Sequence, residues 1–201
     1  LGENRRFFAY FHPALEDEPI IFVEIALTKG LAKSIQELTR PNDGKKEDYD
    51  TATFYSISNC QEGLSRVTLG NFLIKRVVYE LQEELPDVKN FGTLSPMQGF
   101  ADWVKSSENE KISEIVQKDN FVKVEFLKSL DLKIGDRKFI DNKDLLTKLA
   151  LNYLAVQKND LGFPINDVCR FHLKNVAEID DIFINSNVSD VGFKRSYGIM
   201  V

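Results

Sequence analysis

The stretch IIFVEIAL, residues Ile20–Leu27, is an almost unbroken run of apolar and β-branched side chains. Runs of this kind are typical of strands covered on both faces, so this one predicts the centre of a mixed sheet. An aromatic-rich segment, Phe7–Phe11, precedes it, and the alternating TATFYSIS, Thr51–Ser58, follows it. Both patterns predict strands, and a further strand is expected over Val88–Leu94.

Helices are expected between and after these strands. Leu31–Leu38 and Gly70–Leu85 each carry one apolar stripe, and a proline stops each of them. From about residue 98 to residue 158 the pattern is helical, with Leu145–Val156 the best-patterned part. The stretch rich in Lys, Glu and Asp, Ser106–Asn142, is expected to be solvated, and the helical insertion as a whole is predicted at about 106–157.

The final quarter predicts two more strands, VCRFHL at Val168–Leu173 and IDDIFI at Ile179–Ile184. This order of elements predicts an α+β fold, with one mixed sheet flanked by helices. The length of 201 residues suits a single domain over 1–201.

Composition excludes several classes of protein. Hydrophobic residues make up 43% of the chain, enough for a core, and no apolar run approaches the roughly 20 residues of a membrane span. A net charge of −5 argues against a nucleic-acid partner, which requires clustered positive charge. The two cysteines, Cys60 and Cys169, lie far apart, so neither a disulfide framework nor a zinc site is indicated.

The connection NCQEGLSRVTLGN, Asn59–Asn71, joins a predicted strand to a predicted helix. A helix N-terminus presents unpaired backbone N–H groups and therefore binds phosphate readily. Gly70 allows close approach to the backbone, and Ser65, Arg66 and Thr68 supply further donors. One basic residue and one glycine do not make a P-loop, so an ordinary capped loop is the alternative interpretation.

A second candidate site combines Ser95, expected at the end of a strand, with His172, expected within another. Strand ends of such sheets are common ligand sites, and a Ser–His contact serves as a nucleophile–base pair or a proton relay. No GxSxG elbow surrounds Ser95, which counts against a hydrolase. The alternative for His172 is a core residue, and the other histidine, His12, is interpreted as a turn residue. The residues alone therefore suggest a small-molecule enzyme with a phosphate-bearing ligand.

Seven sequence blocks carry a family resemblance. They are RRFFAYFHPAL (Arg5–Leu15), EPIIFVEIALTKG (Glu18–Gly30), FYSISNCQEGL (Phe54–Leu64), LGNFLIKRVVYELQEE (Leu69–Glu84), FGTLSPMQGF (Phe91–Phe100), RFHLKN (Arg170–Asn175) and GIMV (Gly198–Val201). In this order they resemble the catalytic domain of malonyl-CoA decarboxylase over nearly the whole chain.

The resemblance implies a fold like the Gcn5-related acetyltransferases (GNAT), in which coenzyme A lies across a splayed mixed sheet. It implies conversion of malonyl-CoA to acetyl-CoA and carbon dioxide without a metal or prosthetic group, coenzyme A being part of the substrate. The family's catalytic serine and histidine fall on Ser95 and His172. Its coenzyme A loop falls on Ser65, Arg66, Val67, Thr68, Leu69, Gly70 and Asn71.

The implied chemistry suits these residue types. Loss of carbon dioxide leaves a thioester enolate, which needs fixed donors for its oxygen and a proton for its α-carbon. The resemblance makes His172, with an ordinary pKa of about 6.5, the expected proton donor. Ser95 is expected to orient the malonyl carboxylate or to relay a proton, without an acyl-serine intermediate.

Several positions depart from the family pattern, among them the serine block, where Gln98-Gly99 stands in place of Pro-Gly. Val176 replaces a glycine, Asp167 replaces a proline, and Asn187 lies in the segment where the family has an acidic residue. These departures leave two alternatives open: an acyltransferase of the same fold and a non-catalytic acyl-CoA sensor.

The resemblance also implies that the helical domain preceding this region in the family is absent here. The full-length protein is expected to form a homo-oligomer. Two lone cysteines favour a reducing interior. The expected location is the cytoplasm, or the mitochondrial matrix or a peroxisome in a eukaryote.

Overall fold

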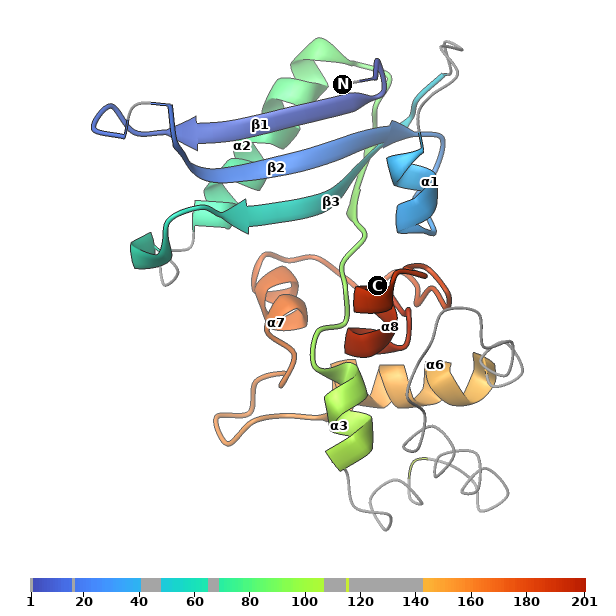
Figure 1. Ribbon diagram of the computed structural model, residues 1–201. Helices are drawn as coiled ribbons and strands as arrows, with labels where there is room; N and C mark the ends of the chain where they lie inside the picture. Colours follow the sequence, from blue (N-terminus) through green and yellow to red (C-terminus); the bar gives the residue numbers. More distant parts are fainter. Residues whose placement is uncertain (1, 16, 41–47, 65–68, 107–114, 116–142) are drawn as a thin grey trace. The chain divides into compact units, whose positions relative to one another are not determined.

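The computed structural model describes residues 2–15, 17–40, 48–64, 69–106, 115 and 143–201. The chain divides into two compact units, an N-terminal unit, Leu1–Leu94, and a C-terminal unit, Ser95–Val201 (Figure 1). Each unit is described by itself, and the single catalytic domain expected from the sequence stays a prediction.

A four-stranded mixed sheet forms the N-terminal unit. Its strands are β1 (Arg5–Phe11), β2 (Pro19–Thr28), β3 (Thr51–Asn59) and β4 (Asn90–Thr93), in the spatial order β1-β2-β3-β4. The first two neighbouring pairs are antiparallel, and β4 joins β3 in parallel. The mixed sheet predicted around residues 20–27 is therefore confirmed, with β2 at an inner position.

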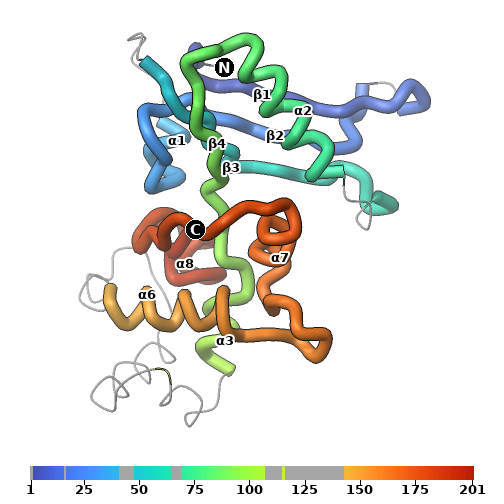
Figure 2. The backbone as a smooth tube through the Cα atoms, turned by 180° about the vertical axis from the view of Figure 1, so that it is seen from behind, coloured from blue at the N-terminus to red at the C-terminus, as the bar shows by residue number. Residues whose placement is uncertain are grey.

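Helix α2 (Leu69–Glu84) covers one face of this sheet, as Figure 2 shows from behind. Its Leu73, Val77 and Leu81 are buried against alternate residues of β2, because side chains of a strand point to opposite faces in turn. A 3₁₀ turn, η1 (Glu62–Leu64), precedes it. The short helix α1 (Ile35–Thr39) begins later than predicted, where the Ser34 hydroxyl accepts the Glu37 N–H.

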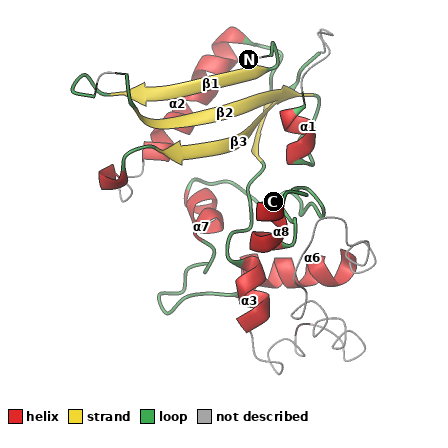
Figure 3. Ribbon diagram, in the orientation of Figure 1, coloured by secondary structure: helices red, strands yellow, loops and turns green. Residues whose placement is uncertain are grey.

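Helices dominate the described part of the C-terminal unit (Figure 3). They are α3 (Phe100–Ser106), α6 (Lys143–Leu151), which continues as the π-helix η4 (Asn152–Val156), α7 (Asp167–Lys174) and α8 (Asp190–Ser196). Their core contains the fully buried Phe100, Leu146 and Tyr197. Of the predicted insertion at about 106–157, residues 107–114 and 116–142 lie outside the described residues.

The strand predicted over Val168–Leu173 is wrong, because these residues form helix α7. Asn166 caps the helix by accepting the Cys169 N–H at 2.7 Å, and Asp167 adds an acidic group to the first turn. Apolar residues fall on both alternating faces of this segment, so its composition did not separate strand from helix, whereas the cap decides for the helix.

The strand predicted over Ile179–Ile184 is also wrong. Of residues 179–184, only Phe183 forms a β-bridge, and this is an isolated antiparallel bridge with Met200. The Asp181 carboxylate accepts the Ile182 N–H at 2.7 Å, so a side chain takes a donor that a strand ladder would need.

Candidate functional site

Ser95 and His172 meet within the C-terminal unit, although 77 positions separate them in the sequence. The Ser95 Oγ and the His172 Nε2 lie 3.1 Å apart. Ser95 is buried, with 8% of its surface exposed, and His172 is half-buried in the last turn of α7. The pair that the sequence singled out is therefore in hydrogen-bond contact, with His172 on a helix instead of the predicted strand.

The C-terminal residues hold the backbone of Ser95. Its N–H donates to the Val201 carbonyl at 2.6 Å, and the Val201 N–H donates back to the Ser95 carbonyl at 2.9 Å. Phe183 and Met200 exchange a second reciprocal pair of backbone hydrogen bonds. The hydroxyl of Ser95 thus projects from a backbone fixed on both its polar groups.

Burial lowers the pKa of His172 from its ordinary value. The Phe171 ring stands edge-on to the imidazole, with centroids 5.2 Å apart, which adds apolar surface next to it. Burial therefore favours the neutral form of the imidazole. A neutral imidazole accepts the Ser95 hydroxyl proton or donates its own Nε2 proton, depending on the tautomer.

This burial predicts a pH dependence. A folded-state pKa below the unfolded value means that the unfolded state binds more protons, so stability rises with pH. Well above pH 6.5, the ordinary pKa of histidine being about 6.5, the imidazole is neutral in both states and its titration does not change the free energy of unfolding. As the pH falls through about 6.5 towards the lower folded-state pKa, only the unfolded state takes up the proton, and the fold is destabilised. We expect NMR to show the His172 ring titrating below 6.5, with a His12→Gln variant assigning the resonances. Titration at or above 6.5 would contradict this.

Helix α7 ends at Lys174, two positions after His172, in a Schellman motif. The Ala177 N–H donates to the His172 carbonyl at 3.1 Å, and the Val176 N–H donates to the Leu173 carbonyl at 3.2 Å. This geometry places Val176 in the left-handed region, with φ of 65°. Glycine normally occupies that position, and a β-branched residue is strained there.

Replacing Val176 with glycine is expected to stabilise the fold by about 1 kcal/mol, since relief of the left-handed strain exceeds the entropy that glycine gains in the unfolded chain. The 95% exposure of Val176 means that little packing is lost. Urea unfolding measures the change. Val191→Gly, the same change inside α8, is the matched control and should destabilise instead. Equal destabilisation by both variants would contradict the strain argument.

The departures from the family pattern at Asp167 and Asn187 both involve residues with local interaction partners. Asp167 lies in the first turn of α7 and pairs with Arg170, at a helix start where proline is also well tolerated. The Asn187 Oδ1 accepts the Ser189 N–H and hydroxyl where α8 begins. A Cβ at Gly192 would meet the Asn187 carbonyl oxygen at 2.4 Å, so only glycine allows this close approach.

The predicted coenzyme A loop is only partly described. Ser65, Arg66, Val67 and Thr68 lie outside the described residues. Leu69, Gly70 and Asn71 form the first turn of the 16-residue α2, where backbone N–H groups lack intrahelical partners. The predicted helix start is therefore confirmed to within one residue, while the binding role of the loop stays a prediction.

The strand that leads to this loop has a partly open edge. β4 pairs with β3 only along Thr51–Phe54, and the Leu94 N–H donates to the Phe54 carbonyl at 3.0 Å. β3 continues to Asn59 beside β2 alone, with a register irregularity where Ser56 and Phe54 face Glu24 and Ile25. The pairing of β3 with β4 therefore ends at Phe54, and the splay of the sheet that the resemblance implies stays a prediction.

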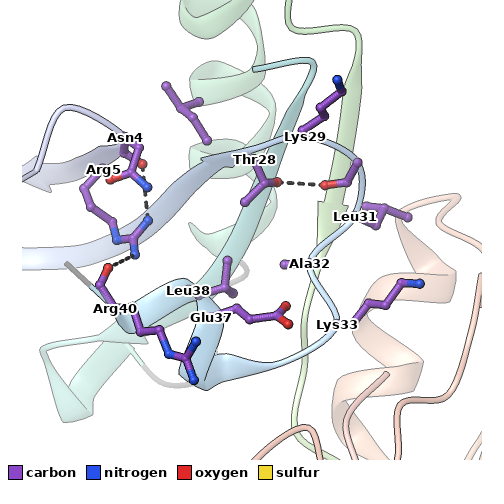
Figure 4. Close-up of a pocket in the computed structure, with 12 residues that line it drawn as sticks. Asn4, Arg5, Thr28, Lys29, Leu31, Ala32, Lys33, Glu37, Leu38 and Arg40 are labelled. Atoms are coloured by element: carbon purple, nitrogen blue, oxygen red, sulfur yellow. Dashed lines mark hydrogen bonds between the residues drawn. The ribbon is translucent and has the colours of Figure 1, made fainter. Parts of the chain in front are cut away.

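A separate pocket of about 440 Å³ lies in the N-terminal unit (Figure 4). Its lining includes four cations and one carboxylate, namely Arg5, Lys29, Lys33, Arg40 and Glu37. It lies where β2 ends and β3 begins, since Thr28 pairs with Thr51. The predicted loop follows the opposite end of β3, so this pocket is not part of it.

Of the residues that the structure describes, no three His, Cys, Asp or Glu side chains form a group that could hold a metal ion. Within the same residues, no helix is long and apolar enough to cross a membrane. Both cysteines are free thiols, Cys60 exposed and Cys169 buried.

Comparisons with known proteins agree on one family. Residues 2–201 match the model of the malonyl-CoA decarboxylase C-terminal domain. The chain is 34% identical to a mitochondrial malonyl-CoA decarboxylase from Anser anser anser and 32% identical to one from Rattus norvegicus, covering 100% of this chain and 44% and 45% of those proteins. It thus spans about half the length of these curated relatives.

Solved structures give the same result. The chain superposes on malonyl-CoA decarboxylase from Rhodopseudomonas palustris with a TM-score of 0.86 at 38% identity, covering 100% of this chain and 46% of that one. The loading GNATL domain of CurA from Lyngbya majuscula matches 93% of this chain and 70% of its own, with a TM-score of 0.52 at 13% identity, which shows the fold alone. The acetyltransferase-like fold predicted from the sequence is confirmed.

Proposed function

The chain belongs to the malonyl-CoA decarboxylase C-terminal domain family, and from this premise we propose that it converts malonyl-CoA to acetyl-CoA and carbon dioxide. The observation that carries the proposal is the 3.1 Å contact between the Ser95 Oγ and the His172 Nε2. A buried serine hydroxyl and a half-buried imidazole form a proton-handling pair, which is what the second half of this reaction requires.

The first half of the reaction breaks one bond. Heterolysis between the α-carbon and the carboxylate carbon releases carbon dioxide and leaves the electron pair shared between the α-carbon and the thioester oxygen. Fixed hydrogen-bond donors stabilise this developing oxyanion, because they are already oriented when the charge appears. Ser95 contributes by orienting the malonyl carboxylate for departure or by relaying the proton that follows.

In the second half, the α-carbon takes a proton from His172, directly or through the Ser95 hydroxyl, and the imidazole recovers a proton from water. Burial lowers the pKa of His172 in the free protein. The bound malonyl carboxylate opposes this effect, since a nearby negative charge favours the imidazolium. The substrate therefore charges its own proton donor, and loss of carbon dioxide leaves that donor facing the enolate.

Coenzyme A is anionic and the chain carries a net charge of −5, so its overall field does not attract the substrate. Local donors must supply the binding. In this proposal the first-turn N–H groups of α2, with Arg66 from the preceding loop, bind the pyrophosphate. The pantetheine arm lies along the edge of β3 beyond Phe54, where β4 no longer pairs with it.

Mass spectrometry after mixing with malonyl-CoA tests the proposal. Appearance of acetyl-CoA in step with loss of malonyl-CoA supports decarboxylation. Release of free coenzyme A with transfer of an acyl group to an acceptor would instead indicate an acyltransferase, and unchanged malonyl-CoA that binds in calorimetry would indicate a sensor. Unchanged malonyl-CoA without binding would contradict the site as well.

The sequence-based expectations about the whole protein stay predictions. The predicted location was the cytoplasm, or the mitochondrial matrix or a peroxisome in a eukaryote. The curated relatives are named mitochondrial, which supports the mitochondrial alternative as a proposal for this protein. Homo-oligomerisation is likewise proposed for the full-length protein.

A further inference from the structure

Asn166 joins the helix that carries His172 to the turn that carries Ser95. Its Oδ1 accepts the Cys169 N–H at 2.7 Å, which caps α7, and its Nδ2 donates to the Gln98 carbonyl at 2.9 Å. Only 3% of the Asn166 surface is exposed. One buried amide therefore uses its oxygen on the helix and its nitrogen on the serine segment.

The serine segment is a compact turn. The Gln98 N–H donates to the Pro96 carbonyl at 3.0 Å, and the Phe100 N–H donates to the Met97 carbonyl at 3.2 Å, where α3 begins. Gln98 thus lies three positions after Ser95 on a hydrogen-bonded backbone. The Gln98 carbonyl also accepts the Tyr153 hydroxyl at 2.7 Å, so both its lone pairs are used.

Two hydrogen bonds connect the same two segments. One joins Asn166 to Gln98, and the other joins His172 to Ser95. Asn166 and His172 are six positions apart, which corresponds to about 9 Å along a helix. Because both hydrogen bonds connect the same two segments, the bond between Asn166 and Gln98 restricts the positions from which His172 can reach Ser95.

Apolar packing by itself would hold α7 in place only weakly. Of its eight residues only Cys169 is buried, and the Cys169 thiol contacts the Leu154 carbonyl at 3.7 Å. A helix with so little buried surface depends on polar contacts for its position. Asn166 is the buried polar contact at its N-terminal end.

We infer that Asn166 is a positioning residue that holds His172 within hydrogen-bond reach of Ser95 by fixing α7 to the Ser95–Phe100 turn. This inference rests on the proposed function for its catalytic consequence, but its structural content concerns only the contact between the two side chains. Asn166 was not among the predicted site residues, because the residues that follow it were predicted to form a strand.

The variant Asn166→Ser separates the two roles of this side chain. Serine is an equally good helix cap, so α7 keeps its start, but the shorter side chain cannot donate to the Gln98 carbonyl. The matched control is Asn159→Ser. Asn159 lies in the same connection, and its Oδ1 accepts only the Leu161 and Phe163 N–H groups of its own turn.

We expect Asn166→Ser to lower kcat for malonyl-CoA about 10- to 100-fold, because small displacements of catalytic groups cost this much, with KM changed less than about threefold. Asn159→Ser is expected to keep kcat within about twofold of wild type. In NMR spectra the His172 ring of Asn166→Ser should shift and titrate closer to its ordinary pKa, since water reaches a loosened α7, whereas Asn159→Ser leaves it unchanged.

Folded Asn166→Ser with wild-type kcat and unchanged His172 resonances would overturn the inference. So would an equal loss of kcat in both variants, which indicates general destabilisation. If Asn166→Ser does not fold, Asn166→Asp replaces it, because aspartate keeps the helix cap and lacks the amide donor. A lowered kcat in Asn166→Asp then supports the inference, and a wild-type kcat overturns it. If the wild-type protein makes no acetyl-CoA, the proposed function fails, and the NMR comparison still decides whether Asn166 positions His172.

Discussion

Replacing His172 with asparagine is expected to lower the turnover of malonyl-CoA by a factor of about 10² to 10⁴, the range that a general acid–base group contributes. Asparagine keeps an amide near the position of the imidazole Nδ1, but it does not reach the Nε2 position that contacts the Ser95 Oγ, and it cannot carry a proton to the enolate carbon. Carbon–carbon cleavage without protonation is readily reversed, so the loss appears in kcat. Steady-state assays of acetyl-CoA formation measure it.

Substrate binding should survive this change. The proposed pyrophosphate contacts belong to the N-terminal unit, so calorimetry should find the affinity of His172→Asn for malonyl-CoA within about tenfold of wild type. His12→Asn is the matched control, because His12 is exposed and its Nδ1 accepts only the Ala14 N–H of a turn. Full activity in His172→Asn, or equal losses in both variants, would contradict the role of His172.

Ser95→Ala is expected to lower kcat about 10²- to 10³-fold, comparable to removing one fixed donor from a charge-stabilising site. The backbone of Ser95 keeps both hydrogen bonds to Val201, so the turn should retain its position. The change removes only the hydroxyl that meets His172. The same acetyl-CoA assay, with urea unfolding to confirm the fold, measures the effect.

Ser106→Ala provides the matched control. The Ser106 hydroxyl is exposed and donates to the Trp103 carbonyl at 3.3 Å, so its loss should leave kcat unchanged. Wild-type kcat in Ser95→Ala would exclude the serine from the chemistry. A loss confined to KM would assign it to ground-state binding alone.

Residues with strong periodicity predicted their structure well. The alternating and β-branched patterns around residues 20–27 and 51–58 gave strands β2 and β3, and the stripe of Leu73, Val77 and Leu81 gave α2. These patterns succeed because the sheet and α2 bury one another, so burial and sequence period agree.

Segments with polar contacts in place of a buried stripe were predicted poorly. In α7 the Asn166 cap and the Schellman motif at Val176 determine a helix that buries one residue. In residues 179–184 the Asp181 side chain takes a backbone donor. α8 begins at the Ser189 cap, in a stretch for which no helix was predicted. Such hydrogen bonds involve only one or two residues of the sequence pattern. The pair Asn166-Asp167, an N-cap residue followed by an acidic residue, is a helix start signal that could have been recognised.

The contact between Ser95 and His172 was anticipated from a partly wrong structure. Both residues were expected on strands, and the serine follows one, but His172 approaches from a helix. The residue types singled out the pair, and the resemblance to the family then assigned both residues catalytic roles. Their 3.1 Å separation depends on contacts distant in sequence, Ser95 with Val201 and Asn166 with Gln98, which local patterns do not encode.

A double-mutant cycle on Ser95 and His172 tests most directly the claim that the two side chains act as one proton-handling unit. The kcat of Ser95→Ala, His172→Asn and the double variant is measured against wild type with malonyl-CoA. Because residues that act together lose their effect together, the double variant is expected to lie within about fivefold of the slower single variant. Losses that multiply in the double variant would show that the two side chains act independently, and would contradict the account.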